Sequence, residues 1–202
     1  MTIKKTFLVV WLIIIGFGIA YLFWYNEWKY SLPTPVPEDY HNVNPGIRVS
    51  IKDIPGLELS PKPLFLHFFN PDCPCSRFNI SHFKSLVKKY DHRIDFAVVV
   101  LTSNMRYTEQ DIQQKFDLSI PVVFDSSYAA ACGVYSTPQA AIINTDKSLY
   151  YRGNYNKTRY CTDKKTNYAQ IAIDSLLSKQ MRPQLGLAAT VSYGCTLPAC
   201  KR

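Results

Sequence analysis

The sequence predicts an α/β fold, in which a mixed central sheet is flanked by helices and preceded by an N-terminal transmembrane helix. Short apolar runs of strand length alternate with segments of helical periodicity after residue 60, and this alternation is typical of helices packed on the faces of one sheet. An uncharged apolar run at residues 7–25 comes first. The remaining roughly 150 residues suit one domain with a single core.

The apolar run reads FLVVWLIIIGFGIAYLFWY and has nineteen residues, which as a helix span roughly 28 Å, close to the hydrocarbon thickness of a bilayer. Lys4 and Lys5 precede it, so the N-terminus should stay in the cytoplasm. Bulky aromatic residues follow it, where a cleaved signal peptide would have small ones. We therefore expect a retained single-pass anchor of the cell inner membrane, with the folded domain on the periplasmic side.

Composition divides the chain into four parts. Residues 1–28 are the cytoplasmic N-terminus and anchor, and residues 29–46, which hold four prolines, are expected to be a semi-extended tether. Residues 47–182 are the expected folded domain, and residues 183–202 form a tail with two cysteines.

The domain should alternate strands and helices along its length. LFLHFF at 64–69 is apolar throughout, as a strand buried on both faces is. The other expected strands are 94–101, 121–124, and a hairpin of 139–144 with 148–152. The expected helices are 78–90, 108–116, 126–132 and 166–179. Thr108 and Asp111 have the spacing of a helix start.

Two cysteines, Cys73 and Cys75, stand between the first strand and the first domain helix, in FNPDCPCSRFN at 69–79. A helix N-terminus offers unsatisfied backbone N–H groups and the positive end of the helix dipole, and both favour a thiolate. The thiolate is the attacking species in disulfide exchange. Cys73 and Cys75 are therefore the candidate catalytic residues, and the sequence leaves open which of them is the nucleophile.

Three features together are similar to the thioredoxin-like superfamily, particularly its redoxin (AhpC/TSA-like) branch. They are the cysteine pair after LFLHFF, the segment Ser136-Thr137-Pro138 before the strand QAAIIN, and the hairpin that ends at Tyr151-Arg152-Gly153. The resemblance covers about residues 47–179 and implies a thioredoxin-like fold. It also implies that Thr137 and Pro138 form a cis-proline turn beside the cysteines, where an extended segment of a protein substrate binds.

The cysteine motif departs from the C-x-x-C of thioredoxins, because here it is C-x-C. A Cys73–Cys75 bridge would close a small, strained ring, and strained disulfides are the more oxidising ones. The peroxiredoxin pattern P-x-x-x-[TS]-x-x-C is absent. The leading interpretation is a membrane-anchored extracytoplasmic thiol–disulfide oxidoreductase that acts on protein thiols or disulfides and needs no cofactor.

Two alternatives stay open. A C-x-C pair offers two thiolates to a soft ion, so one alternative is a Cu(I)-binding metallochaperone of the same fold. The other is a thioredoxin-like scaffold without catalysis. The formal net charge is +8, but the basic residues are spread out, so we expect no nucleic-acid partner. Contact with the membrane should be through the N-terminal helix.

The remaining cysteines have less defined roles. Cys161, Cys195 and Cys200 are candidates for a disulfide that staples the tail: Cys161 with either tail cysteine, or the two tail cysteines with each other. A resolving cysteine for the Cys73 and Cys75 site is a further interpretation. Cys132 lies in an alanine-rich segment and is expected to be a buried small side chain.

Overall fold

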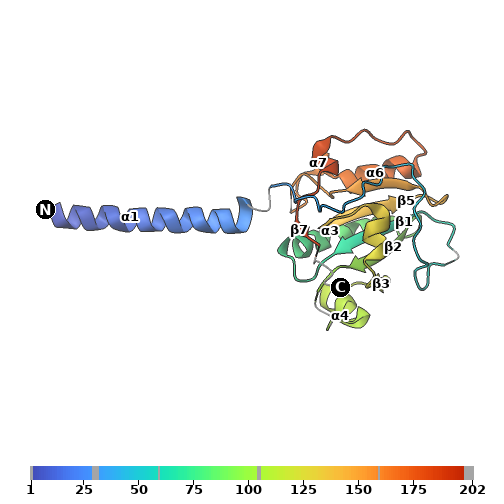
Figure 1. Cartoon of the computed structure of the whole chain (residues 1–202), viewed down its shortest axis with the longest axis horizontal. Coiled ribbons are helices and arrows are strands. Elements are labelled where there is room, and N and C mark those ends of the chain that lie inside the picture. Colours follow the sequence, from blue (N-terminus) through green and yellow to red (C-terminus); the bar gives the residue numbers. More distant parts are fainter. Residues whose placement is uncertain (1, 29–31, 59, 104–105, 159, 198–202) are drawn as a thin grey trace. The chain divides into compact units, whose positions relative to one another are not determined.

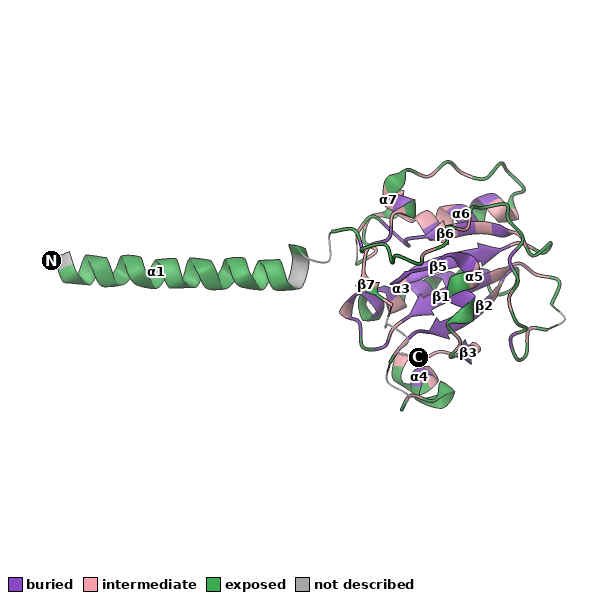
Figure 2. Cartoon of the chain, in the orientation of Figure 1, coloured by how far each residue is buried: buried purple, intermediate pink, exposed green. Residues whose placement is uncertain are grey.

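The computed structural model of the chain describes residues 2–28, 32–58, 60–103, 106–158 and 160–197. It divides into two units, one made of the N-terminal helix and one that begins at Pro33. In the first unit, helix α1 (Thr2–Phe23) continues into a short π-helical turn, η1 (Trp24–Trp28). Helix α1 is exposed from Ile3 to Phe23 and is long and apolar enough to cross a membrane (Figure 2).

The second unit is built on a five-stranded sheet in the order β3-β2-β1-β5-β6 (Figure 1). The strands are β1 (Leu64–Phe69), β2 (Asp95–Val100), β3 (Val122–Val123), β5 (Gln139–Ile143) and β6 (Leu149–Gly153). Strands β1, β2 and β3 are parallel, whereas β5 runs antiparallel to β1 and β6 antiparallel to β5. The predicted mixed sheet is confirmed, and β1 lies at its centre.

The domain helices are α3 (Pro74–Tyr90), α4 (Glu109–Phe116), α5 (Ser127–Cys132), η2 (Lys164–Thr166), α6 (Tyr168–Leu177) and α7 (Leu187–Thr190). Helix α3 begins four residues before the predicted start at residue 78. The reason is Pro74, which occupies the first helical position with Cys73 as the N-cap; proline suits this position because its missing N–H would be unpaired there in any case. The predicted start of α4 at Thr108 is confirmed as a capping box with Asp111.

The sheet separates two apolar layers. Phe65 and Phe69 of β1 point into the layer under α3, α4 and α6, where Phe83 of α3 also lies. Leu66 and Phe68 point to the opposite face, which α5 covers. Strand β1 is thus buried on both sides, as its unbroken apolar sequence predicts, and Figure 2 shows the central strands enclosed. Cys132 is fully buried in the second layer, as expected.

Two features of the second unit differ from the expected layout. Residues 33–46, expected as a tether, lie against the domain: Thr34 is buried, and the Tyr40 hydroxyl donates to the Gly133 carbonyl at 3.0 Å. The chain also forms a small second sheet, in which β4 (Ser136–Thr137) pairs with β7 (Cys195–Thr196) of the tail. The described part of the C-terminal tail, residues 183–197, is therefore part of the fold.

Candidate active site

The first turn of α3 fixes the position of Cys73. Its backbone N–H donates to the Asn70 carbonyl at 3.1 Å, and its carbonyl accepts the Arg77 N–H at 3.2 Å. The Asn70 N–H donates to the Ser76 hydroxyl at 3.2 Å, which ties the loop after β1 to the helix. As the N-cap, Cys73 has an extended backbone and places its side chain beside the positive end of the helix dipole.

A cis peptide bond between Thr137 and Pro138 lies next to this turn. The Thr137 carbonyl oxygen is 3.9 Å from Cys73 Sγ, although the two residues are 64 positions apart. Both are buried. The expected cis proline is confirmed, together with the expected proximity of Thr137 to the first cysteine.

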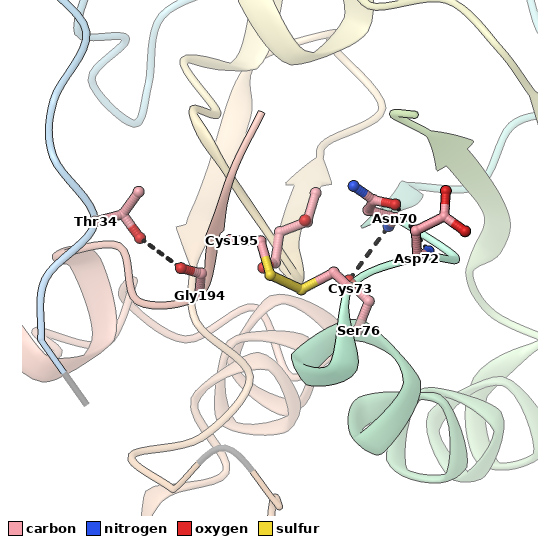
Figure 3. Close-up of a disulfide and its surroundings, with 8 residues drawn as sticks. Thr34, Asn70, Asp72, Cys73, Ser76, Gly194 and Cys195 are labelled. Carbon is pink, nitrogen blue, oxygen red and sulfur yellow. Dashed lines mark hydrogen bonds between the residues drawn. A yellow bond between two sulfur atoms is a disulfide. The ribbon is translucent and has the colours of Figure 1, made fainter. Parts of the chain in front are cut away.

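Cys73 is disulfide-bonded to Cys195, which is 122 residues away in the sequence. Figure 3 shows this bond between the start of α3 and the tail (Figure 3). Strand β7 makes the bond possible, because its antiparallel register puts Cys195 opposite Thr137. The disulfide therefore lies beside both the helix N-terminus and the cis peptide.

This pairing differs from the disulfides expected to staple the tail, and it joins a tail cysteine to the Cys73 and Cys75 site, for which a resolving cysteine was also considered. Cys195 bonds neither Cys161 nor Cys200, and Cys73 does not bond Cys75. The physical reason is the pairing of β4 with β7, a contact between segments far apart in the sequence that no local sequence pattern predicts. Cys75 keeps its thiol in the buried first turn of α3. The sulfur atoms of Cys73, Cys75 and Cys195 all lie within 4.8 Å of one another.

Gly194 allows the tail to come this close. Its φ is +139°, in the region that favours glycine, and a Cβ built on it would lie 2.3 Å from the Thr137 carbonyl oxygen. Its own carbonyl accepts a hydrogen bond from the Thr34 hydroxyl at 3.3 Å (Figure 3). The glycine before Cys195 is thus a requirement of the close approach between β7 and the cis-proline turn.

Buried side chains anchor the tail just before Gly194. The Gln139 amide donates to the Ser192 hydroxyl at 2.6 Å. The Asn154 amide donates to two tail carbonyls, those of Ala188 at 2.9 Å and Val191 at 2.6 Å. Because Gln139, Asn154 and Ser192 are all buried, these hydrogen bonds are shielded from water and hold the segment firmly in place.

The carboxylate of Asp72, next to the cysteine turn, has hydrogen-bond partners of its own. Asp72 accepts hydrogen bonds from the Tyr107 hydroxyl at 2.8 Å and the Thr102 hydroxyl at 3.0 Å. It stands immediately before Cys73 and would oppose a thiolate there, but its side chain is exposed and neutral donors satisfy it.

Two further thiols in the described residues, those of Cys132 and Cys161, do not belong to this cluster. Cys161 keeps its thiol, whose sulfur accepts a hydrogen bond from the Asn79 amide at 3.0 Å. Burial raises the pKa of Cys161 to about 11 and that of Cys132 to about 12, so both are protonated near neutral pH and are poor nucleophiles. Cys200 lies outside the described residues.

Comparisons with known proteins place the chain in a family. Residues 50–199 match the family model described as Domain of unknown function (DUF6436). The chain belongs to this family. The DUF6436 match includes every residue of the sulfur cluster and the cis-proline turn. Among curated proteins, none matches the chain.

Two solved structures share the fold of this DUF6436 chain. A hypothetical protein from Sinorhizobium meliloti 1021 has 16% identity and a TM-score of 0.64, over 78% of this chain and 96% of its own. An uncharacterized conserved protein from Geobacillus kaustophilus has 19% identity and a TM-score of 0.58, and the match covers 68% of this chain and 77% of that protein. A thioredoxin-like protein solved in its oxidised form has 14% identity and a TM-score of 0.49, over 73% and 97%.

The fold is thioredoxin-like, as the sequence resemblance implies. The sheet order, the cysteine-initiated helix after the central strand and the cis proline before β5 agree with this fold. Sequence reasoning did not identify Gly194, Thr34, Gln139 or Asn154 as parts of the site. Only the Gly-Cys dipeptide at residues 194–195 gave a local signal, since glycine marks positions where the backbone comes close.

Proposed function

We propose that the chain is a membrane-anchored, extracytoplasmic thiol–disulfide oxidoreductase whose nucleophile is Cys73. The observation that carries this proposal is the position of Cys73: it caps helix α3, is joined by a disulfide and lies 3.9 Å from the carbonyl before the cis Thr137–Pro138 bond. A cysteine at a helix N-terminus favours its thiolate, which is the species that exchanges disulfides.

The reduced protein would use Cys73 to attack a substrate disulfide and form a mixed disulfide with one half of the substrate. A second thiol of the cluster would then release that half as a thiol. Thr137 and Pro138 would hold an extended segment of the substrate by main-chain pairing with β4, in the place that β7 occupies in the oxidised protein. Substrates are therefore protein thiols or disulfides in extended segments.

The location outside the cytoplasm belongs to the same proposal. Helix α1 is long and apolar enough to span the membrane, and Lys4 and Lys5 precede its apolar stretch. The Cys73–Cys195 disulfide also fits an oxidising compartment, where disulfides form and persist. We expect the full chain to sediment with the inner membrane and its domain to be digested by protease added to spheroplasts; a domain protected from that protease would contradict the location.

The activity is tested with the full chain in detergent. The protein is equilibrated with glutathione buffers of graded potential, and its thiols are trapped and mapped by mass spectrometry. We expect the Cys73–Cys195 bond to open and close reversibly, and Cys73→Ser to lose all disulfide-reductase activity. Cys161→Ser, which removes a thiol outside the cluster, should keep it.

Two results would contradict the proposal. One is a Cys73→Ser variant with unchanged activity. The other is a Cys73 bond that does not exchange in any of these buffers, which is the outcome expected of a non-catalytic scaffold.

A second candidate function is Cu(I) binding, favoured by the three sulfur atoms within 4.8 Å of one another. Once the disulfide is reduced, Cys73, Cys75 and Cys195 offer three thiolates, and soft thiolate ligands select Cu(I). We expect the reduced chain to bind one Cu(I) in competition with a chromophoric chelator, and Cys75→Ser to weaken this binding. Equal Cu(I) affinity in the wild type and in Cys75→Ser would exclude the site.

A further inference from the structure

We infer that Cys195, rather than Cys75, is the resolving cysteine of the reaction at Cys73, and that strand β7 holds it at the edge where an extended partner would bind. This inference rests on the proposed oxidoreductase function. It assigns a catalytic role to a tail residue that is far from the C-x-C motif in sequence. It also gives the tail a defined place in the reaction.

The geometry of β7 is that of a strand added to the edge of β4. Thr137 pairs with Cys195 and Ser136 with Thr196, in antiparallel register. Main-chain pairing of this kind is the way extended peptides bind to an exposed sheet edge. The Cys73–Cys195 bond therefore has the arrangement of a mixed disulfide between Cys73 and an extended partner, formed within one chain.

The tail is built to keep Cys195 in reach. The Thr34 N–H donates to the Ser192 carbonyl at 2.8 Å, and Gln139 and Asn154 hold residues 188–192 from inside the domain. Cys195 is three residues beyond this anchor, so it cannot diffuse far from Cys73 when the bond opens. A thiol held in this way has a high effective concentration, on the order of millimolar or above.

Cys75 is less well placed for the same task. It lies in the first turn of α3, where side chains two positions apart do not face each other. A Cys73–Cys75 bond would therefore require this turn to unwind and would sacrifice the helix N-terminus that favours the Cys73 thiolate. The bond to Cys195 forms with α3 intact. Cys195 is also partly exposed, whereas Cys75 is buried, so Cys195 is the more accessible thiol.

The reaction balances in two exchange steps. In the first, the Cys73 thiolate attacks a partner disulfide, so that a Cys73–partner bond forms and the other half of the partner leaves as a thiolate that takes up a proton. In the second, the Cys195 thiolate attacks Cys73 Sγ, the Cys73–Cys195 bond forms, and the second partner thiol leaves. Two electrons pass from the two cysteines to the partner, and the reverse sequence oxidises a dithiol partner.

Oxidised glutathione is the probe for the test, applied to the reduced full chain in detergent and followed by quenched intact-mass and peptide-mass analysis. In Cys195→Ser we expect the glutathionyl adduct on Cys73 to persist about 100-fold longer than in the wild type, when free glutathione is held near 10 µM, since a dilute thiol replaces a tethered one. In Cys75→Ser the adduct should decay as in the wild type and leave the Cys73–Cys195 bond.

A second variant displaces Cys195 without removing its thiol. Gly194→Ala would put a Cβ 2.3 Å from the Thr137 carbonyl, whereas Gly186→Ala has open space and is its control. We expect Gly194→Ala to prolong the adduct at least about tenfold, because it removes the close approach that gives Cys195 its effective concentration, and Gly186→Ala to behave as the wild type.

The outcomes separate the two proposals. An adduct that persists in Cys75→Ser but decays normally in Cys195→Ser would assign the resolving role to Cys75 and overturn the inference, and so would equal decay in both variants. If Cys73 of the wild type forms neither an adduct nor a disulfide under these conditions, the oxidoreductase function itself fails.

Discussion

Acidification tests the environment of His67, which lies in the middle of β1. Its side chain is fully buried, its Nδ1 is 2.6 Å from the Tyr155 hydroxyl, and its ring stacks on Phe83 with centroids 4.2 Å apart. Desolvation lowers the pKa of His67 from 6.5 to about 3. The imidazole is therefore neutral in the folded protein at every pH at which the protein would work.

The direction in which the free energy of unfolding changes with pH follows from proton uptake by the unfolded chain. Below pH 6.5 the unfolded chain protonates this histidine, whereas the folded protein does not do so until about pH 3, so stability is complete above pH 6.5 and falls as the pH drops toward 3. Each pH unit in that window costs about 1.4 kcal/mol. Because the unfolded histidine is only half protonated at pH 6.5, the free energy of unfolding should fall by about 2 kcal/mol between pH 6.5 and 4.5 from this group alone.

The measurement is urea unfolding of the full chain in detergent at pH 6.5 and 4.5, followed by near-ultraviolet circular dichroism of tyrosine. Tryptophan is unsuitable, since all three tryptophans precede residue 29. His67→Gln removes the titrating group, so its loss of stability on acidification should be about 2 kcal/mol smaller than that of the wild type. His92→Gln, at an exposed position, is the control and should keep the wild-type loss. Burial also lowers the pKa of His82, but that histidine is present in both variants. An equal loss in His67→Gln and the wild type would refute the reasoning.

Three further predictions concern stability. Cys195→Ser removes the bond that closes a loop with a sequence separation of 122. Under oxidising conditions it should lower the free energy of unfolding by up to about 5 kcal/mol, because the unfolded chain gains conformational entropy. A reductant should abolish the difference from the wild type, and a difference that survives reduction would show that it does not come from the disulfide. Thr108→Ala removes the capping box of α4 and should cost about 1 kcal/mol in the same urea assay; an unchanged midpoint would mean that the cap contributes nothing. Gly153→Ala would put a Cβ 2.1 Å from the Ala189 carbonyl and should lower the free energy of unfolding by about 1–3 kcal/mol through overpacking. Gly186→Ala meets open space and should not lower it. Equal effects of the two substitutions would argue against the close contact at Gly153.

The sequence by itself determined most of the sheet and its helices. The strand at residues 64–69 was predicted with its observed bounds, and the strands near 95–100 and 139–143 were predicted within a residue or two. The reason is that apolar residues recur with a fixed period on the buried face of a strand or a helix, so a short stretch of sequence is enough to recognise each element. The apolar N-terminal helix and the cysteines at the start of α3 are local signals of the same kind.

Only the tertiary structure decided the partner of Cys73. Six cysteines allow fifteen complete pairings, and no periodicity distinguishes Cys195 from Cys161 or Cys200. The pairing depends on β4 meeting β7 and on hydrogen bonds from Thr34, Gln139 and Asn154 to the tail. Such contacts join segments more than 30 residues apart, and their strength depends on complementary shape and hydrogen bonding that exist only once the chain is folded.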